Sequence, residues 1–375
     1  MLGAYGPWAA AIVGDAPARL SFRRPEFNDV ATWRPRARAA VDRALLAPAR
    51  GAAPSVEVAH RFEYDGLEIE HLSWKLPYGP PTEALILQPK GAKGRLPAIL
   101  ALHDHGGNKY FGLRKITRMG PERHPLMVEH QDHYYGGVAW ANEIARRGYV
   151  VLVHDAFLFG SRRVRAADVP KSIARDLVEV DPESPDEIRA YNKWASDHES
   201  IVAKSLFCAG TTWPGVFLSE DRAALDILAA RANVDPRRIG CAGLSGGGLR
   251  TAYLAGVDDR IKAACCVGMM TTWRDYLLNK TYTHTWMIYP PGLPLELDYP
   301  EIAAMRAPLP LLVQYDEEDS LFTLPEMKRA DRMIAEIYAK AGAPDRYRGA
   351  FYPGPHKFDL AMQREAFDWF DARLV

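Results

Sequence analysis

Residues 240–256 read GCAGLSGGGLRTAYLAG, and this stretch decides the fold. Ser245 lies in a GxSxG pattern with Gly243 and Gly247, after an apolar run and before a segment that favours a helix. A turn this tight strains the serine backbone, at about 1–3 kcal/mol, and side chains two positions away would collide. The strain needs a reason to persist, and exposure of a reactive hydroxyl supplies one. The pattern predicts a nucleophile elbow with Ser245 as the nucleophile.

A glycine-rich turn from strand to helix can instead bind phosphate at the N-terminus of the helix. Here GLSGGG has no lysine at the P-loop position, and the GxGxxG spacing is absent after the first predicted strand. The elbow is therefore the favoured interpretation, and phosphate binding is the alternative.

Strand and helix patterns alternate on both sides of the elbow. Half-buried strands of alternating polarity are predicted at 56–64, 67–76 and 83–89. Continuous apolar runs, typical of buried parallel strands, follow at 96–104, 148–156, 237–245, 261–268 and 309–316, with a more mixed run at 347–354. Helical segments lie between several of them, at 138–148, 219–234, 247–257 and 324–343. This order predicts an α/β protein with a doubly wound, mostly parallel sheet and an antiparallel N-terminal edge.

Two stretches interrupt the alternation. Residues 157–213 are polar with a short predicted helix, and residues 269–305 are rich in Trp, Tyr, Thr and Pro. Both follow strands, where the loops and lids of α/β enzymes lie, so we interpret them as lid insertions. A helix predicted at 28–46 packs outside the sheet. The expected organisation is an N-terminal helical segment, 1–55, on a catalytic domain, 56–375.

A serine nucleophile needs a general base and an acid that orients it, in the chain order Ser, acid, His. His356 lies in FYPGPHKFD, after the last predicted strand, where a loop can bring it over Ser245. His284, the other histidine after Ser245, precedes any late acid and is the candidate for a substrate contact. Asp319 follows the strand at 309–316 and is the favoured acid, and Asp316, at the end of that strand, is the alternative.

The oxyanion of an acyl-transfer intermediate needs two N–H donors. We predict the amide of Gly246 as one, and as the other the amide of His105 or, second, of Gly106, in the segment HDHGGNKYFG at 103–112. The histidines of this region, with Asp104, leave a metal site as an alternative. Since no HExxH-like motif accompanies them, we predict neither a metal nor a cofactor.

Composition narrows the partners. Lys plus Arg and Asp plus Glu number 47 each, so no net charge draws the chain to nucleic acid or to an anionic membrane. No apolar run is long enough for a membrane span, and no secretion signal is evident, which predicts a cytoplasmic protein. Cys241, Cys265 and Cys266 lie in predicted strands and are expected in the core. Apolar residues of the N-terminal segment leave a homo-oligomer open.

Taken together, these segments resemble bacterial α/β-hydrolases of the acetyl xylan esterase-like and dienelactone hydrolase-like kind. The likeness runs from the helix near Trp33 through LHDHGGNK, HDAFLFGSRR, the elbow, LLVQYDEEDSLF and FYPGPHKFD. It implies the α/β-hydrolase fold, with Ser245, Asp319 and His356 on the triad positions. It also implies that Asp155, Gly160 and Arg162 support the active-site loops.

The expected activity is hydrolysis of carboxylic esters of small molecules, such as acylated sugars or aromatic esters, through an acyl-enzyme. Hydrolysis of C–C bonds, lactones or peptides by the same triad is the alternative, and a noncatalytic binding protein of this fold is a further one. Aromatic side chains of the two insertions are expected to shape the pocket beside His284, namely Trp273, Trp286 and Trp213.

Overall fold

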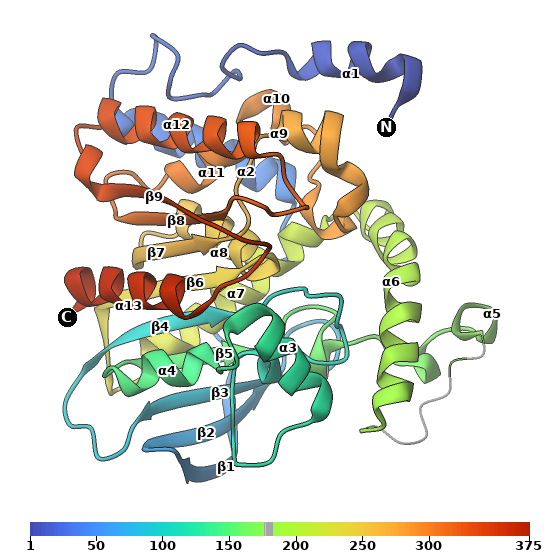
Figure 1. Ribbon diagram of the computed structural model, residues 1–375, viewed down its shortest axis with the longest axis vertical. Coiled ribbons are helices and arrows are strands. Elements are labelled where there is room, and N and C mark those ends of the chain that lie inside the picture. The colour runs from blue at the N-terminus through green and yellow to red at the C-terminus, as the bar shows by residue number, and fades with distance from the viewer. Residues whose placement is uncertain (176, 178–182) are drawn as a thin grey trace.

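The computed structural model describes residues 1–175, 177 and 183–375. Its strands form one sheet in the order β1-β2-β3-β5-β4-β6-β7-β8-β9 (Figure 1). The antiparallel part consists of β1 (Val56–Tyr64), β2 (Leu67–Trp74) and β3 (Thr82–Pro89), with β3 also antiparallel to β5 (Val150–His154). The other strands are parallel, namely β4 (Leu96–Leu102), β6 (Val234–Leu244), β7 (Ile261–Val267), β8 (Leu311–Asp316) and β9 (Tyr347–Tyr352). The predicted sheet is confirmed.

Alternate residues of the central strands enter two separate cores. In β4, Ala98 and Leu100 join one apolar cluster, and Ile99 and Ala101 join the other. The first cluster is covered by α2 (Val30–Leu45), α7 (Trp213–Ala230), α8 (Gly246–Val257), α11 (Tyr299–Ala304) and α12 (Leu324–Lys340). The second is covered by α4 (Trp140–Arg146) and α13 (Leu360–Leu374). Burial on both faces explains why these strands are apolar without alternation.

The N-terminal segment contains η1 (Gly3–Tyr5), α1 (Gly6–Val13) and α2. Asp29 caps α2 by accepting the amides of Ala31 and Thr32, at 3.0 and 3.1 Å. Trp33 is fully buried, and its indole N–H donates to the Leu20 carbonyl at 2.6 Å. Helix α2 thus packs on the core, whereas the separation of the N-terminal segment from the rest at residue 55 stays a prediction.

The insertion at 157–213 contains more helix than the sequence predicted. It forms η3 (Gly160–Arg162), η4 (Ala166–Asp168), α5 (Lys171–Ala174) and the long α6 (Pro185–Cys208), and its residues 176 and 178–182 lie outside the described part. Helix α6 has 24 residues and stands along one end of the sheet (Figure 1). Proline at its first position and two acids in its first turn are ordinary start signals. Because one face of α6 is exposed to solvent, the segment has a polar composition, and the sequence predicted only a short helix here.

The remaining segments are short. The insertion at 269–305 consists of α9 (Trp273–Asp275), η5 (Tyr276–Lys280), η6 (Thr281–Thr283), η7 (Trp286–Ile288), α10 (Leu293–Glu296) and α11. Elsewhere lie η2 (Leu113–Lys115), α3 (Pro125–Tyr135) and η8 (Pro344–Arg346). The cysteines of the strands, Cys241, Cys265 and Cys266, are buried free thiols, as predicted.

No single described helix is long and apolar enough to cross a membrane. Helices α6 and α7 meet that criterion only as a pair, by length and composition, and the chain bends by 82° between them.

Candidate active site

The turn from β6 into α8 presents Ser245 at the carboxyl edge of the sheet. Its backbone has φ 56° and ψ −117°, a conformation that side-chain-bearing residues rarely adopt. A Cβ on Gly243 would lie 2.7 Å from the Gly247 Cα, and a Cβ on Gly247 would lie 2.9 Å from the Leu102 carbonyl carbon. Both positions therefore require glycine, which is the steric reason for the GxSxG pattern.

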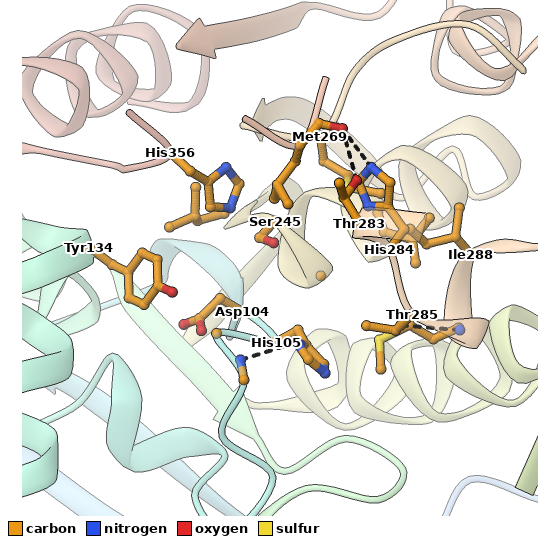
Figure 2. Close-up of a pocket in the computed structure, with 17 residues that line it drawn as sticks. Asp104, His105, Tyr134, Ser245, Met269, Thr283, His284, Thr285, Ile288 and His356 are labelled. Atoms are coloured by element: carbon orange, nitrogen blue, oxygen red, sulfur yellow. Dashed lines mark hydrogen bonds between the residues drawn. The ribbon is translucent and has the colours of Figure 1, made fainter. Parts of the chain in front are cut away.

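His356 lies in the loop between β9 and α13, and its Nδ1 is 2.6 Å from Oδ2 of Asp319. The other carboxylate oxygen of Asp319 accepts the Leu321 amide at 2.9 Å, which fixes the acid in the loop after β8. A carboxylate can only accept, so Nδ1 carries the proton and Nε2 is left as a base. Nε2 is buried without a hydrogen-bond partner among the described residues, and the ring faces Ser245 (Figure 2).

The charge of the imidazole is governed by opposing effects. Burial lowers the pKa of His356, but the hydrogen bond and charge of Asp319, with smaller effects of Asp316 and Asp104, outweigh it, so the pKa is raised overall. The site therefore favours the protonated, imidazolium form of His356.

Asp316, the alternative acid, contacts the same loop in a different way. Its Oδ2 accepts the Lys357 amide at 3.1 Å, next in the chain to the histidine, whereas no described hydrogen bond joins it to the imidazole. Burial raises the pKa of Asp316 to about 7. The geometry thus gives Asp319 the contact with His356 and leaves Asp316 as a support for the loop.

The predicted oxyanion loop lies against the elbow. A Cβ on Gly246 would be 3.1 Å from the His105 amide nitrogen, so the two backbones are in contact. Both residues and Gly106 line the cavity in front of Ser245. Within the described part of the chain, the amides of His105 and Gly106 donate no hydrogen bond, which leaves them available to a ligand.

The side chain of Asp104 stabilises this loop through hydrogen bonds. Its side chain is 1% exposed and accepts hydrogen bonds from Tyr135 and, at 3.1 Å, from Nε2 of His130. Burial opposes its ionisation, but the charges of His130 and Lys115 and the hydrogen bonds hold its pKa well below the usual range.

The cavity in front of Ser245 has a volume of about 190 Å³ (Figure 2). Its apolar wall comes from α8, the second insertion and the loop after β8, and consists of Leu249, Met269, Met287, Ile288 and Leu321. Its polar wall includes Tyr134 and His284. Burial lowers the pKa of His284 to about 4, and its Nε2 donates to the Leu321 carbonyl at 2.9 Å, so the ring is neutral. His284 thus lines the cavity, and its contact with a substrate stays a prediction.

The three tryptophans expected in the pocket lie elsewhere, and the structure corrects that expectation. Trp273 is buried under the second insertion, where its indole N–H donates to the Leu297 carbonyl at 3.0 Å. Trp213 begins α7 in the core, and Trp286 is 43% exposed at the surface. Their size favours packing of the inserted segments, while Thr283 and Thr285 of the same insertion line the cavity.

Tyr134 was missed because its helix was missed. The helix α3 begins at Pro125 and ends before Gly136, whose φ is 64°. Proline at the first position and a left-handed glycine after the last are start and stop signals that the sequence contains. The apolar stripe of α3 is weak, because some of its buried residues are polar and hydrogen-bonded. Hydrophobic periodicity therefore did not predict this helix.

Side chains that the resemblance assigned to loop support do contact loops. Asp155 accepts the amides of Leu113 and Ser161, both at 2.7 Å, and Arg162 donates to the Tyr78 carbonyl at 3.2 Å. A Cβ on Gly160 would collide with the Asp155 carboxylate. These contacts tie the loops after β4 and β5 together.

The structure does not gather the histidines of 103–133 into a metal-ligand group. His103 and His130 contact Asp104, and His105 contacts Glu199 at 3.2 Å. Within the described ranges, the one group of three ligand atoms close enough for a metal, all within 4.8 Å, is Asp316, Asp319 and His356. In that group the histidine Nδ1 is already hydrogen-bonded to Asp319, so a metal would have to replace its proton.

The sheet order, the strained serine after β6 and the histidine after the last strand define the α/β-hydrolase fold, and the chain has this fold. Residues 213–314, which contain the elbow, match the prolyl oligopeptidase family.

Individual proteins with a similar sequence or a similar structure are also known. A protein of Bacillus subtilis (strain 168), provisionally named hydrolase YtaP, is 28% identical over 315 residues, which are 83% of this chain and 90% of YtaP. A protein of Bacteroides fragilis NCTC 9343, provisionally described as an acetyl xylan esterase, has a crystal structure similar at a TM-score of 0.69, with 20% identity over 94% of this chain and 83% of that one. A glucuronoyl esterase from Solibacter usitatus gives 0.63, with 16% identity over 96% and 98%. At these identities, the two solved structures establish the fold.

Proposed function

We propose that this protein is a serine esterase that hydrolyses carboxylic esters of small molecules through an acyl-enzyme. The observation that carries the proposal is the strained Ser245 beside a histidine whose Nδ1 is hydrogen-bonded to Asp319. The esterases among the structural neighbours and the hydrolase name of the curated relative support the same class of reaction.

In the proposed reaction, Nε2 of His356 takes the proton of Ser245 as its Oγ bonds to the ester carbonyl carbon. The carbonyl electrons move to the oxygen, which the amides of Gly246 and of His105 or Gly106 stabilise. The C–O bond to the alcohol then breaks, and the imidazolium returns its proton to the departing alcohol. Water repeats these steps on the acyl-enzyme and releases the acid.

Labelling tests the assignment of the nucleophile. We expect a fluorophosphonate to add one phosphonyl group per chain, with the label on the peptide that contains Ser245. The labelled enzyme should have lost its turnover of p-nitrophenyl acetate. An unlabelled enzyme with unchanged turnover would contradict the serine mechanism and favour the metal alternative.

The cavity predicts a preference for short acyl groups. About 190 Å³ lies below the common range for ligand pockets, about 300–1,000 Å³, and its apolar wall suits a few methyl or methylene groups. We expect kcat/KM for p-nitrophenyl esters to fall at least about tenfold from acetate or butyrate to decanoate. Equal rates across the series would show that the acyl chain does not occupy this cavity.

The raised pKa of His356 predicts the acid side of the pH profile. The base acts in its neutral form, so kcat/KM should increase with pH as the imidazolium loses its proton. Because Asp319 raises that pKa, the midpoint should lie above the ordinary histidine value of about 6.5. Measurement of kcat/KM from about pH 5 to about pH 8 checks this, and a midpoint below that value would show that the pair is uncoupled.

The match to the prolyl oligopeptidase family favours peptide hydrolysis as the second candidate. The match ends at residue 314 and includes Ser245, but not Asp319 or His356. A substrate panel that pairs each acyl ester with the corresponding anilide distinguishes ester hydrolysis from peptide hydrolysis. An esterase should show measurable kcat/KM for the ester but not for the anilide.

A further inference from the structure

Beneath the predicted oxyanion loop lies a buried lysine that the proposed chemistry does not use. Lys115, in η2, has no exposed surface, and its Nζ donates to the carbonyl oxygens of Asp104 and His105, both at 2.8 Å. Its Nζ also lies 4.6 Å from the centre of the Phe159 ring and 3.8 Å from Oδ2 of Asp104. Burying an ammonium is costly, so its position calls for an explanation.

The two carbonyls belong to particular peptide units. The carbonyl of Asp104 shares a planar peptide with the N–H of His105, and the carbonyl of His105 shares one with the N–H of Gly106. In a trans peptide the C=O and N–H point in opposite directions. The lysine therefore holds the carbonyl ends of the same two peptides whose N–H groups are predicted to receive the oxyanion.

A second donor acts on the first of these peptides. Nε2 of His103 accepts the Ala156 amide at 3.2 Å, so Nδ1 carries the proton and donates to the Asp104 carbonyl at 3.0 Å. The carbonyl oxygen of that peptide thus accepts two hydrogen bonds, one of them from a cation. Such bonds polarise the amide and make its N–H a stronger donor.

We propose that Lys115 is a positioning residue for the oxyanion hole, and that its buried ammonium orients and polarises the peptides that carry the His105 and Gly106 N–H groups. The proposal rests on the proposed esterase function. The lysine touches neither the substrate nor Ser245, and acts only through the backbone. In the transition state, its charge also stabilises the nearby oxyanion through a medium of low polarity.

Two roles of Lys115, holding the loop by hydrogen bonds and polarising its peptides by charge, differ in their response to pH. Burial lowers the pKa of Lys115 to about 8. A neutral amine still has two N–H bonds for the two carbonyls, so the loop stays pinned after deprotonation while the charge is lost. The charged and titratable groups that face the lysine are Asp104, Asp155, Lys109, Arg250, His103 and His105.

The test begins with wild-type enzyme. We expect kcat for p-nitrophenyl acetate to fall as pH rises through about 8, and a trifluoromethyl ketone to bind more weakly over the same range. The ketone accepts the Ser245 oxygen at its carbonyl carbon and places an alkoxide in the oxyanion hole. Its affinity therefore reports on the hole. A flat kcat up to about pH 9.5 would overturn the proposal without any variant.

The variant Lys115→Met removes the charge and keeps the length. Loss of a whole oxyanion donor costs about 100- to 1,000-fold, so loss of polarisation should lower kcat by about 10- to 100-fold and abolish the alkaline decrease. Lys109→Met should keep that decrease, because Lys109 contacts the His105 and Glu199 side chains rather than the peptides.

Lys340, which is exposed, provides a control with similar backbone contacts. It also donates to two backbone carbonyls, those of Phe22 and Arg24, both at 2.7 Å, and lies 4.8 Å from the centre of the Phe22 ring, at the end of α12. Lys340→Met should cost stability without lowering kcat. A folded Lys115→Met enzyme with wild-type kcat would overturn the inference. Failure of fluorophosphonate to label wild-type Ser245 would instead overturn the proposed function.

Discussion

Replacing Ser245 with alanine should lower the kcat for p-nitrophenyl acetate by about a millionfold and abolish fluorophosphonate labelling. Removal of the nucleophile from a serine hydrolase has an effect of about this size, because the base and acid have no function without it. Residual catalysis over water should persist, since the predicted oxyanion donors of Gly246 and His105 are untouched. The comparison requires an enzyme sample free of other esterases.

Ser245→Gly supplies a control that tests the strain independently of the chemistry. At φ 56° and ψ −117°, alanine keeps the Cβ and thus the strain, whereas glycine adopts this conformation without it. Both variants should be inactive, but only the glycine variant should gain stability, by about 1 kcal/mol or more. Equal melting temperatures would show that the elbow is unstrained in solution, and substantial activity in either variant would exclude Ser245 as the nucleophile.

The sheet was predictable because its strands carry two different patterns. Strand β2 alternates between buried and partly buried residues, whereas the buried parts of β4 to β8 are largely apolar because helices cover both faces. The helices α8 and α12 were equally clear. By contrast, α3 and α6 bury polar side chains such as His130 and Glu199, so hydropathy did not predict α3 and predicted only a short helix in the region of α6.

The candidate site was predictable where chain order and local sterics constrain it. Gly243 and Gly247 marked Ser245, and the order of acid and histidine indicated His356 and two aspartates. The choice between Asp316 and Asp319 needed the geometry of the loop. Lys115 could not be predicted, because its contacts are to backbone carbonyls ten and eleven residues earlier, and backbone acceptors leave no trace in a sequence.

The tryptophan prediction failed for a related reason. Aromatic residues in an insertion after a strand can line a pocket or fill the space beneath the insertion, and composition does not distinguish these outcomes. Trp273 fills such a space among Tyr276 and Tyr299. The pocket instead uses the smaller Thr283 and Thr285, whose size leaves room for a substrate.

The two aspartates after β8 form a matched pair for the second large effect. Asp319→Asn should lower kcat by about 10⁴-fold, the effect known for the corresponding change in a Ser-His-Asp protease. An asparagine NH₂ can donate to Nδ1 of His356, which would place the imidazole proton on Nε2 and remove the base. The loss of the negative charge should also move the acid midpoint of kcat/KM to lower pH.

Asp316→Asn should lower kcat by less than about tenfold, because an asparagine oxygen can still accept the Lys357 amide. Its pKa of about 7 means that the wild-type carboxyl is already partly protonated near neutral pH, and asparagine resembles that form. Steady-state kinetics of the two variants at one pH, with melting curves to show that both are folded, decide between the acids. A large loss with Asp316→Asn and a small one with Asp319→Asn would reverse the assignment. Equal large losses would mean that the two carboxylates act on His356 as one coupled group.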